Sequence, residues 1–280
     1  MIRVFLGVKA RGKRREKHTT ELPHLIKNVF VSLFLCFSQM TKSTKEILLQ
    51  GSTSSTVASS SEVKIRSYES SDYEDCREIF TQGMEQLISL VTRVVFPRYC
   101  WILAVLSVFV FLAAFKHNLW IVPLYIFACA VLLSLLYVDV YLECWKFINN
   151  CLATDLMNIE KSYMSSDGSH MWVAEWNGKV VGMVGLIHNE DRKPGVAELQ
   201  RMSVSPICRR MGIARKLMDE LLKHAKDQQF EKLELTTTSA QTPAIRLYKK
   251  YGFKLMAVFP YPQKILADLQ YTCFDLRLID

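Results

Sequence analysis

An apolar stretch in the middle of the chain limits what it can fold into more than any other feature. Residues 99–115 and 119–138 contain no charged side chain, and Lys116 is the single charge between them. A buried core hairpin of this composition would not fit a domain of this size, whereas about 20 apolar residues let a helix cross a bilayer. We therefore predict a membrane hairpin over residues 96–139, either two full spans or one re-entrant hairpin.

A strand and a helix are predicted just before the apolar stretch. Val63 and Ile65 alternate with polar residues, as in a half-buried strand. Residues 72–87 have apolar side chains at helical spacing, and Ser71 or Asp72 can cap the first turn. The apolar face of this helix consists of Cys76, Ile79, Phe80, Met84 and Leu87.

Residues 1–60 differ from the rest of the chain in composition. Basic side chains crowd residues 3–17, and the Ser/Thr-rich run at 51–61 is typical of a flexible linker. The apolar run 29–37 is shorter than the ~20 residues that span a bilayer. A signal peptide, an amphipathic anchor and a transit peptide stay open. The basic residues could meet nucleic acid or anionic lipid, but a solvated tail explains them more simply. We predict a disordered extension with no nucleic-acid partner.

Strands and helices alternate after the apolar stretch. Asn177-Gly178, the strongest short hairpin signal, joins two of the predicted strands. The apolar patterns predict strands at 171–175, 179–187, 197–204, 232–237, 253–259 and 271–278. They predict helices at 142–163, 213–225 and 243–251. Alternation of this kind, with hairpins at both ends, indicates an α+β domain with a mixed sheet.

The clearest chemical signal is a strand that leads into a glycine-containing helix start. After the strand 197–204 and a short loop comes Arg209-Arg210-Met211-Gly212-Ile213-Ala214-Arg215. Unpaired N–H groups at a helix start can hold a pyrophosphate, and a glycine lets the backbone approach closely. Arg209, Arg210, Arg215 and Lys216 add positive charge at the helix end where basic residues oppose the dipole. An anionic ligand would explain their presence.

These residues resemble the GCN5-related N-acetyltransferase (GNAT) superfamily. Arg209-x-x-Gly212-x-Ala214 is similar to its Q/R-x-x-G-x-G/A signature. Leu247-Tyr248-x-x-x-Gly252-Phe253 resembles its second block, with Gln241 where an Asn is frequent. Within the superfamily the chain is most similar to the camello-like acetyltransferases over residues 62–260. The matching segments are Thr154-Asp155 with Ile159 and Tyr163, Trp172–Glu175, Val180–Val184, Arg201–Val204 and Gly212–Ala214.

The resemblance implies the fold and the cosubstrate. Camello-like enzymes carry an apolar insertion at the same place, so residues 61–95 and 140–280 would form one acetyltransferase domain around the hairpin. Its sheet would be mixed and mostly antiparallel. Acetyl-CoA would place its pyrophosphate on the amides of 210–215 and its pantetheine arm along 202–204. The implied binding residues are Met202, Ser203, Val204, Arg209, Arg210, Met211, Gly212, Ile213, Ala214 and Arg215.

The resemblance also implies two catalytic residues. Glu198 would be the general base that deprotonates the acceptor ammonium, and Tyr248 would protonate the leaving thiolate. A strand-end surface charge and a core tyrosine are the structural alternatives. A covalent route through Cys208 or Cys151 has no neighbouring His to support it, so direct transfer is expected. The eight cysteines form no CxxC pair, and we expect no metal.

The shared sheet constrains the topology. Strands on both sides of residues 99–138 would pair with each other, so both ends of the hairpin lie on one side of the membrane. Arg93, Arg98 and Lys146 flank the apolar stretch 99–138, against Lys116 in its short loop, which favours a cytosolic catalytic domain. We expect an integral membrane protein of the endoplasmic reticulum that contacts membrane lipid.

The acceptor is expected to be a small-molecule amine. The resemblance implies the amino group of an amino-acid-type compound, such as a cysteine S-conjugate or aspartate. A lysine acetyltransferase acting on proteins of the secretory pathway is the alternative enzyme. A non-catalytic membrane protein that keeps the fold is the third possibility, although the intact helix-start motif argues against it. The sequence does not predict an oligomeric state.

Overall fold

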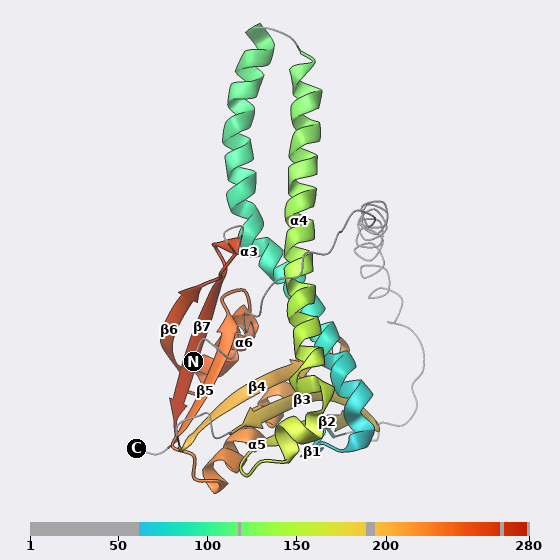
Figure 1. Ribbon diagram of the computed structural model, residues 1–280, viewed down its shortest axis with the longest axis vertical. Coiled ribbons are helices and arrows are strands. Elements are labelled where there is room, and N and C mark those ends of the chain that lie inside the picture. Colours follow the sequence, from blue (N-terminus) through green and yellow to red (C-terminus); the bar gives the residue numbers. More distant parts are fainter. Residues whose placement is uncertain (1–61, 117–118, 189–193, 264–265, 279–280) are drawn as a thin grey trace, which may run out of the picture. The chain divides into compact units, whose positions relative to one another are not determined.

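The computed structural model describes residues 62–116, 119–188, 194–263 and 266–278. The predicted N-terminal extension, residues 1–60, lies outside them. The described residues belong to one compact unit, built on a seven-stranded sheet in the order β1-β2-β3-β4-β5-β7-β6 (Figure 1). The strands are β1 (Lys64–Ser67), β2 (His170–Trp176), β3 (Lys179–Ile187), β4 (Val196–Val204), β5 (Lys232–Thr238), β6 (Lys254–Pro260) and β7 (Gln270–Arg277).

Six strand pairings hold this sheet together, and five of them are antiparallel. Only β4 and β5 run parallel. β1, which precedes the apolar stretch, pairs along its length with β2, which follows it. The prediction of one mixed, mostly antiparallel sheet with a hydrophobic insertion is therefore confirmed.

The Asn177-Gly178 turn between β2 and β3 is also confirmed. Asn177 has a φ of 53° and Gly178 a φ of 73°, as a type I′ turn requires. This left-handed pair matches the right-handed twist of the flanking strands, so the local sequence sets the register from Trp176↔Lys179 onward.

Helices α5 (Ile213–Asp227) and α6 (Thr242–Lys250) contribute to the core on one face of the sheet. The stripe predicted for α5, Ile213, Leu217, Leu221 and Ala225, is fully buried against strand residues such as Leu199 and Leu233. Burying an aliphatic side chain of this size contributes about 1.5–3 kcal/mol. This burial holds the start of α5 firmly against the sheet.

The first turns of helix α3 (Tyr73–Lys116) and the last turns of helix α4 (Ile121–Ala153) pack on the opposite face of the sheet. A 3₁₀ turn, Ser70–Asp72, leads into α3, and the Asp72 carboxylate accepts the Glu69 N–H at 2.9 Å. The predicted apolar face of α3 is buried at Cys76, Ile79, Phe80 and Leu87, while Met84 is half-buried. α3 continues without a break into the apolar stretch.

The far parts of α3 and α4 run side by side as a helical hairpin that extends away from the sheet (Figure 1). Each contains an apolar window long enough to cross a membrane, with mean hydropathy 2.1 and 2.5 and 6% of the window buried. Large side chains such as Trp101, Phe109 and Phe127 are exposed. This pattern suggests membrane association.

The base of the hairpin packs against the connection between β6 and β7. Leu266 and Leu269 from this connection are buried in one cluster with residues of both helices, among them Val95 and Val140. Arg98 forms an ion pair with Asp268 at 3.2 Å. The hairpin is therefore joined to the edge of the sheet that carries β6 and β7.

The helix predicted over 142–163 is shorter in the structure. α4 ends at Ala153, and a 3₁₀ turn (Asp155–Met157) and a π-helical turn (Glu160–Met164) follow. The guanidinium of Arg77, from α3, donates to the carbonyls of Leu152 (2.9 Å) and Leu156 (2.7 Å). A side chain thus satisfies carbonyls that a continuing helix would have paired, so the helix can stop there.

Candidate functional site

The parallel strands β4 and β5 separate in the middle of the sheet. They pair only over Val196–Glu198 and Lys232–Glu234, and no further pairs between them occur in the described residues. Figure 1 shows the two strands diverging beyond this point. The rest of β4 stays paired with β3, through Gly182↔Val204 and Met183↔Ser203. One backbone edge of residues 199–204 is thus left facing the opening.

A β-bulge in β4 accompanies the opening. Arg201 and Met202 together stand opposite Val184, because the register passes from Met183↔Ser203 to Gly185↔Gln200. Arg201 has a φ of 54°, the left-handed conformation that non-glycine residues rarely adopt. A bulge adds local twist and bends its strand. It gives a physical cause for the divergence of β4 from β5.

The predicted phosphate-binding loop follows β4 directly. Gly212 precedes α5 as its N-cap, with a φ of 80°, and Arg210 is also left-handed, with a φ of 66°. The Gly212 carbonyl accepts the N–H groups of Arg215 and Lys216, at 3.0 and 3.1 Å. Among the described residues, no close backbone hydrogen bond is found for the N–H groups of 210–214. A Cβ on Gly212 would meet no atom within 4 Å, so space is open above the loop.

The predicted cofactor-binding residues lie in two adjoining segments. Met202, Ser203 and Val204 end β4, beside the opening. Arg209, Arg210, Met211 and Gly212 are exposed, and Arg215 is exposed on the first turn of α5. Ile213 is buried and Ala214 half-buried, so a ligand at this loop would meet their backbone amides rather than their side chains.

Lys216 does not belong to this basic group. Its amine donates to the Val63 carbonyl at 3.1 Å and pairs with Glu62 at 3.4 Å. The sequence-based assignment of Lys216 to the phosphate site is therefore not supported by these contacts. They direct the side chain toward β1, leaving three arginines near the loop.

Glu198 lies at the point where the strands part. It is the last β4 residue paired with β5, opposite Ile187 on β3 and Glu234 on β5. Its side chain is buried, and Gln200 Nε2 donates to Glu198 Oε2 at 2.9 Å. Its neighbours Ala197 and Leu199 belong to the core on the α5 side, so Glu198 faces the side that carries α3 and α4.

Two further carboxylates continue this row across the sheet. Glu234 stands opposite Asp275 of β7, and Lys232 binds both, at 2.9 and 3.1 Å. Carboxylates directly opposite one another are destabilising unless a cation separates them. The row is thus polar and acidic, with Glu198 and Asp275 buried and Lys232 offsetting part of its charge.

Tyr248 is a buried residue of α6. Its ring lies 5.9 Å from that of Phe253, and burial raises the pKa of Tyr248 to about 12. The phenol therefore keeps its proton at neutral pH. It belongs to the core on the α5 side, so it has a packing role whatever else it does.

An ion pair beneath β4 was not predicted from the sequence. Arg201 Nε and Nη2 donate to the two carboxylate oxygens of Asp155, each at 2.7 Å, and the Tyr163 hydroxyl donates to Asp155 Oδ2 at 2.6 Å. Burial alone would raise the pKa of Asp155, but the hydrogen bonds and charge of Arg201 outweigh it, so the pKa is lowered. The only sequence signal was that these residues lie in the family-like segments.

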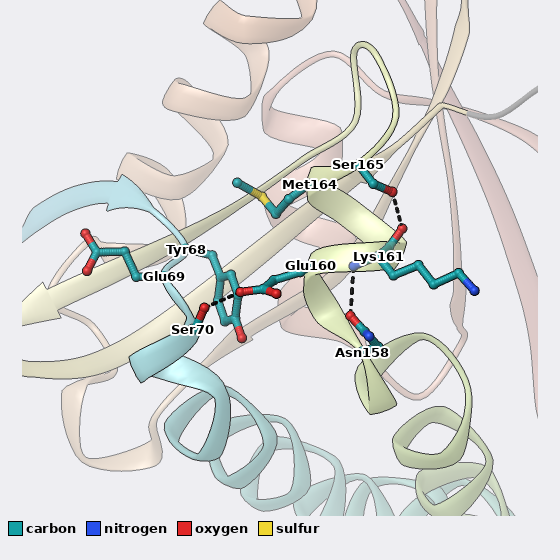
Figure 2. A pocket seen from close by; sticks show the side chains of 8 residues that line it. All are labelled: Tyr68, Glu69, Ser70, Asn158, Glu160, Lys161, Met164 and Ser165. Atoms are coloured by element: carbon teal, nitrogen blue, oxygen red, sulfur yellow. Dashed lines mark hydrogen bonds between the residues drawn. The ribbon is translucent and has the colours of Figure 1, made fainter.

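A surface hollow of about 650 Å³ lies elsewhere in the fold (Figure 2). The residues after β1 form one side and the π-helical turn forms the other, with Ser70 hydrogen-bonded to Glu160. None of the predicted catalytic or cofactor-binding residues lines this hollow. The residues that line this hollow therefore do not identify it as the candidate active site.

No group of three or more His, Cys, Asp or Glu side chains that could hold a metal ion occurs among the described residues. Cys151 and Cys208 are both buried free thiols, and burial raises the pKa of each. Raised thiol pKa values disfavour the nucleophilic thiolate.

Comparison with known proteins identifies relatives of about two thirds to three quarters of this chain. The acetyltransferase (GNAT) family profile matches residues 137–253. N-acetyltransferase 8F1 of Mus musculus is 36% identical over 195 residues, which is 68% of this chain and 85% of the relative. The probable N-acetyltransferase camello of Xenopus tropicalis is 33% identical over 218 residues, covering 76% and 94% of the two chains. Among solved structures, an acetyltransferase of the GNAT family from Staphylococcus aureus Mu50 aligns with a TM-score of 0.48 and 18% identity, covering 78% of this chain and 99% of that one.

Proposed function

The chain belongs to the camello-like branch of the acetyltransferase (GNAT) family and is an N-acetyltransferase, and we propose that it moves an acetyl group directly from acetyl-CoA to the amino group of a small amino-acid-type acceptor. The observation that carries this proposal is the opening between β4 and β5 beside a glycine-capped helix start. Together they provide a free strand edge and a free set of amides.

The helix start would bind the pyrophosphate. The unpaired N–H groups of 210–214 supply hydrogen bonds, and the dipole of α5 favours negative charge at this end. Arg209, Arg210 and Arg215 are exposed nearby and would add charge attraction. The open space above Gly212 fits a bulky anionic group.

The free edge of β4 would hold the pantetheine arm. Residues 202–204 keep their hydrogen bonds to β3 on one side, so their other edge can pair with the amides of an extended ligand. Addition of an extended segment to a strand edge is a common mode of recognition. It would direct the thioester toward the point where the strands part, at Glu198.

Glu198 would act as general base. An acceptor ammonium must lose a proton before its nitrogen can attack the thioester carbonyl. The Glu198 carboxylate would take this proton, directly or through a water. The new C–N bond then forms, the C–S bond breaks, and water takes the second proton from the nitrogen as the amide is completed.

Tyr248 would protonate the leaving thiolate. The phenol is protonated at neutral pH, but its pKa, raised by burial to about 12, lies above the ordinary thiol range and works against the transfer, so this role follows the family resemblance alone. The departing sulfur would take this proton, and the phenolate would regain one from solvent. A direct route of this kind needs no acyl-enzyme, in agreement with the raised pKa values of the Cys151 and Cys208 thiols.

The acceptor is proposed to be a cysteine S-conjugate or aspartate, as the resemblance to camello-like acetyltransferases implies. The acidic row of Glu198, Glu234 and Asp275 supports a cationic amine but does not distinguish between these compounds. Protein lysine acetylation in the secretory pathway is the second candidate, since a lysine side chain offers the same amine.

We propose that residues 61–95 and 140–280 form the catalytic domain and residues 96–139 the membrane hairpin. The continuity of α3 and α4 into the apolar stretch supports this division. The flanking Arg93, Arg98 and Lys146 favour a catalytic domain on the cytosolic side of the membrane. The membrane is proposed to be that of the endoplasmic reticulum.

Membranes from cells expressing the full chain would test the activity. Acetyl-CoA turnover would be measured with S-benzylcysteine, aspartate and a lysine peptide, and membranes carrying Gly212→Glu would be the control. We expect turnover with one of the two small acceptors that is lost in the control. Turnover with the lysine peptide alone would favour the second candidate. Parent membranes that turn over none of the three would overturn the proposed acceptor class.

A further inference from the structure

A chain of hydrogen bonds connects Glu198 to the residues that follow α4. Gln200 Nε2 donates to Glu198 Oε2 at 2.9 Å, and Gln200 Oε1 lies 3.3 Å from the Tyr163 hydroxyl. That hydroxyl lies 2.6 Å from Asp155 Oδ2, and Arg201 binds both oxygens of Asp155 at 2.7 Å. This series of hydrogen bonds runs from the buried Asp155–Arg201 ion pair to the Glu198 carboxylate, where the strands part.

The β4 bulge brings these side chains to one face. Gln200 shares the face of Glu198, because two residues separate equivalent positions along a strand. The left-handed Arg201 then places its guanidinium 5.4 Å from the centre of the Phe80 ring, on the side of α3. Without the bulge, Arg201 would point to the face opposite Gln200.

The Tyr163 ring is fixed in place. It is fully buried, and a Cβ on Gly185 would come within 2.4 Å of a ring carbon, so only glycine allows this approach. A fixed ring holds its hydroxyl at one point between Asp155 and Gln200. The hydroxyl therefore restricts where the Gln200 amide can lie.

The Tyr163 hydroxyl carries one proton, so it can donate to only one of its two neighbours at a time. This proton can go to Asp155 Oδ2, at 2.6 Å, or to Gln200 Oε1, at 3.3 Å, and Arg201 bonds both Asp155 oxygens in either case. A glutamine amide can present either its N–H₂ or its carbonyl to a neighbour. With Glu198 ionised, the N–H₂ group donates to Glu198 and the Gln200 carbonyl accepts the Tyr163 proton, which is the arrangement of these two contacts. With Glu198 protonated, the reversed amide would accept from Glu198 and donate to the Tyr163 oxygen, whose own proton then goes to Asp155.

We propose that Gln200 is the positioning residue of the general base, held by Tyr163 and the Asp155–Arg201 pair. It hydrogen-bonds Glu198 before proton transfer and, by turning its amide over, after it. This inference rests on the proposed role of Glu198 as base. It assigns no contact with substrate to Gln200, Tyr163, Asp155 or Arg201.

Other ionisable groups near Glu198 are already engaged. On β5, Glu234 stands opposite Glu198 and is bound by Lys232, which also binds Asp275 of β7. At the end of β3, His188 Nδ1 lies 3.0 Å from the Val196 carbonyl. Gln200 is a hydrogen-bond donor to the Glu198 carboxylate from β4 itself.

Gln200→Met tests the proposal, because it keeps the length of the side chain and removes both hydrogen bonds. Rates would be measured against pH in membranes, with the acceptor of the three-compound panel that turns over fastest. A donor to a carboxylate favours its ionised form, so we expect the acidic limb of the kcat/KM profile to move up by about one to two pH units. We also expect kcat to fall about tenfold or more while the KM for acetyl-CoA stays the same.

Tyr163→Phe is the second variant, and Tyr73→Phe is its control. Tyr163→Phe removes only the hydroxyl that anchors Gln200, so we expect a smaller shift of the same limb. Tyr73→Phe also removes one hydroxyl, bonded to the Met157 carbonyl at 3.2 Å, outside this chain of hydrogen bonds. It should match the parent.

Glu198→Gln separates failure of the inference from failure of the proposed function. If Glu198→Gln keeps the parent kcat, Glu198 is not the base and that part of the proposed function is wrong. If Glu198→Gln loses activity while Gln200→Met keeps the parent profile, only the positioning role is wrong. A lower kcat in Gln200→Met without any shift of the limb would indicate simple packing and would also overturn it.

Discussion

Replacing Gly212 by glutamate should abolish the binding of acetyl-CoA without unfolding the protein. Gly212 has a φ of 80° and would present its new side chain into open space, since no atom lies within 4 Å of its Cβ position. The side chain would extend over the amides of 210–214, where the pyrophosphate is proposed to lie. A carboxylate there would both occupy the space and repel the phosphates.

The expected magnitude has two parts. A side chain in the left-handed conformation costs about 1–2 kcal/mol in stability, whatever its chemistry. A carboxylate about 6 Å from a phosphate charge adds repulsion of about 3 kcal/mol at an effective dielectric constant of about 20. Each 1.4 kcal/mol is a factor of about ten in affinity, so the charge alone should weaken binding by about 100-fold.

Gly178→Glu is a matched control for the backbone term. Gly178 has a φ of 73°, and its Cβ position is also open, but it lies in the β2–β3 turn. Acetyl-CoA affinity would be measured by titration calorimetry and stability by thermal unfolding, on purified protein in detergent. Gly212→Gln would separate the volume of the side chain from its charge.

We expect both glutamate variants to lose similar stability and only Gly212→Glu to lose affinity. If Gly212→Glu bound acetyl-CoA as tightly as Gly178→Glu, this loop would not hold the pyrophosphate. If Gly212→Gln lost as much affinity as Gly212→Glu, the electrostatic part of the reasoning would be wrong.

Three further predictions follow from the same structure. Tyr248→Phe should lower kcat by ~10²–10⁴-fold, the usual contribution of a general acid, with acetyl-CoA affinity unchanged in the same titration; an unchanged kcat would leave Tyr248 as a packing residue. Tags before residue 62 and after residue 280 should both be digested by protease on intact vesicles; both protected would reverse the orientation, and a split result that persists in a chain started at Met40 would refute the single shared sheet. The lowered pKa of Asp155 means that its pairing with Arg201 stabilises the fold above about pH 4, the ordinary range of the unfolded carboxyl, and that this stability is lost as pH falls through the lower folded value. Asp155→Asn should therefore flatten the acid side of the thermal-unfolding profile, and an unchanged slope would show that the pair contributes little.

Local patterns were enough to predict most elements of this fold. The Asn177-Gly178 turn, the α5 stripe from Ile213 to Ala225 and the strands on either side of the hairpin depend on spacings within a few residues, and the structure confirms them. Joining the strand before the hairpin to those after it required the family resemblance. Periodicity alone does not show that Lys64 pairs with Glu175.

Side-chain partners were not predictable in the same way. The helix expected to reach residue 163 ends at Ala153, because Arg77 from another helix takes its carbonyls. Lys216 is drawn to the Val63 carbonyl and away from the phosphate loop. In each case the deciding partner is more than 70 residues away in the sequence.

The sequence by itself determined the apolar hairpin, the order of strands and helices and the glycine at the start of α5, since each of these follows from the chemistry of neighbouring residues. The tertiary structure decided where β4 and β5 part, that Glu198 stands at this point, and that Arg201 turns through a bulge to meet Asp155. Strand register and the pairing of buried charges depend on which distant segments share a face of the sheet. That is settled only when the whole sheet has formed and each buried polar group has found its partner.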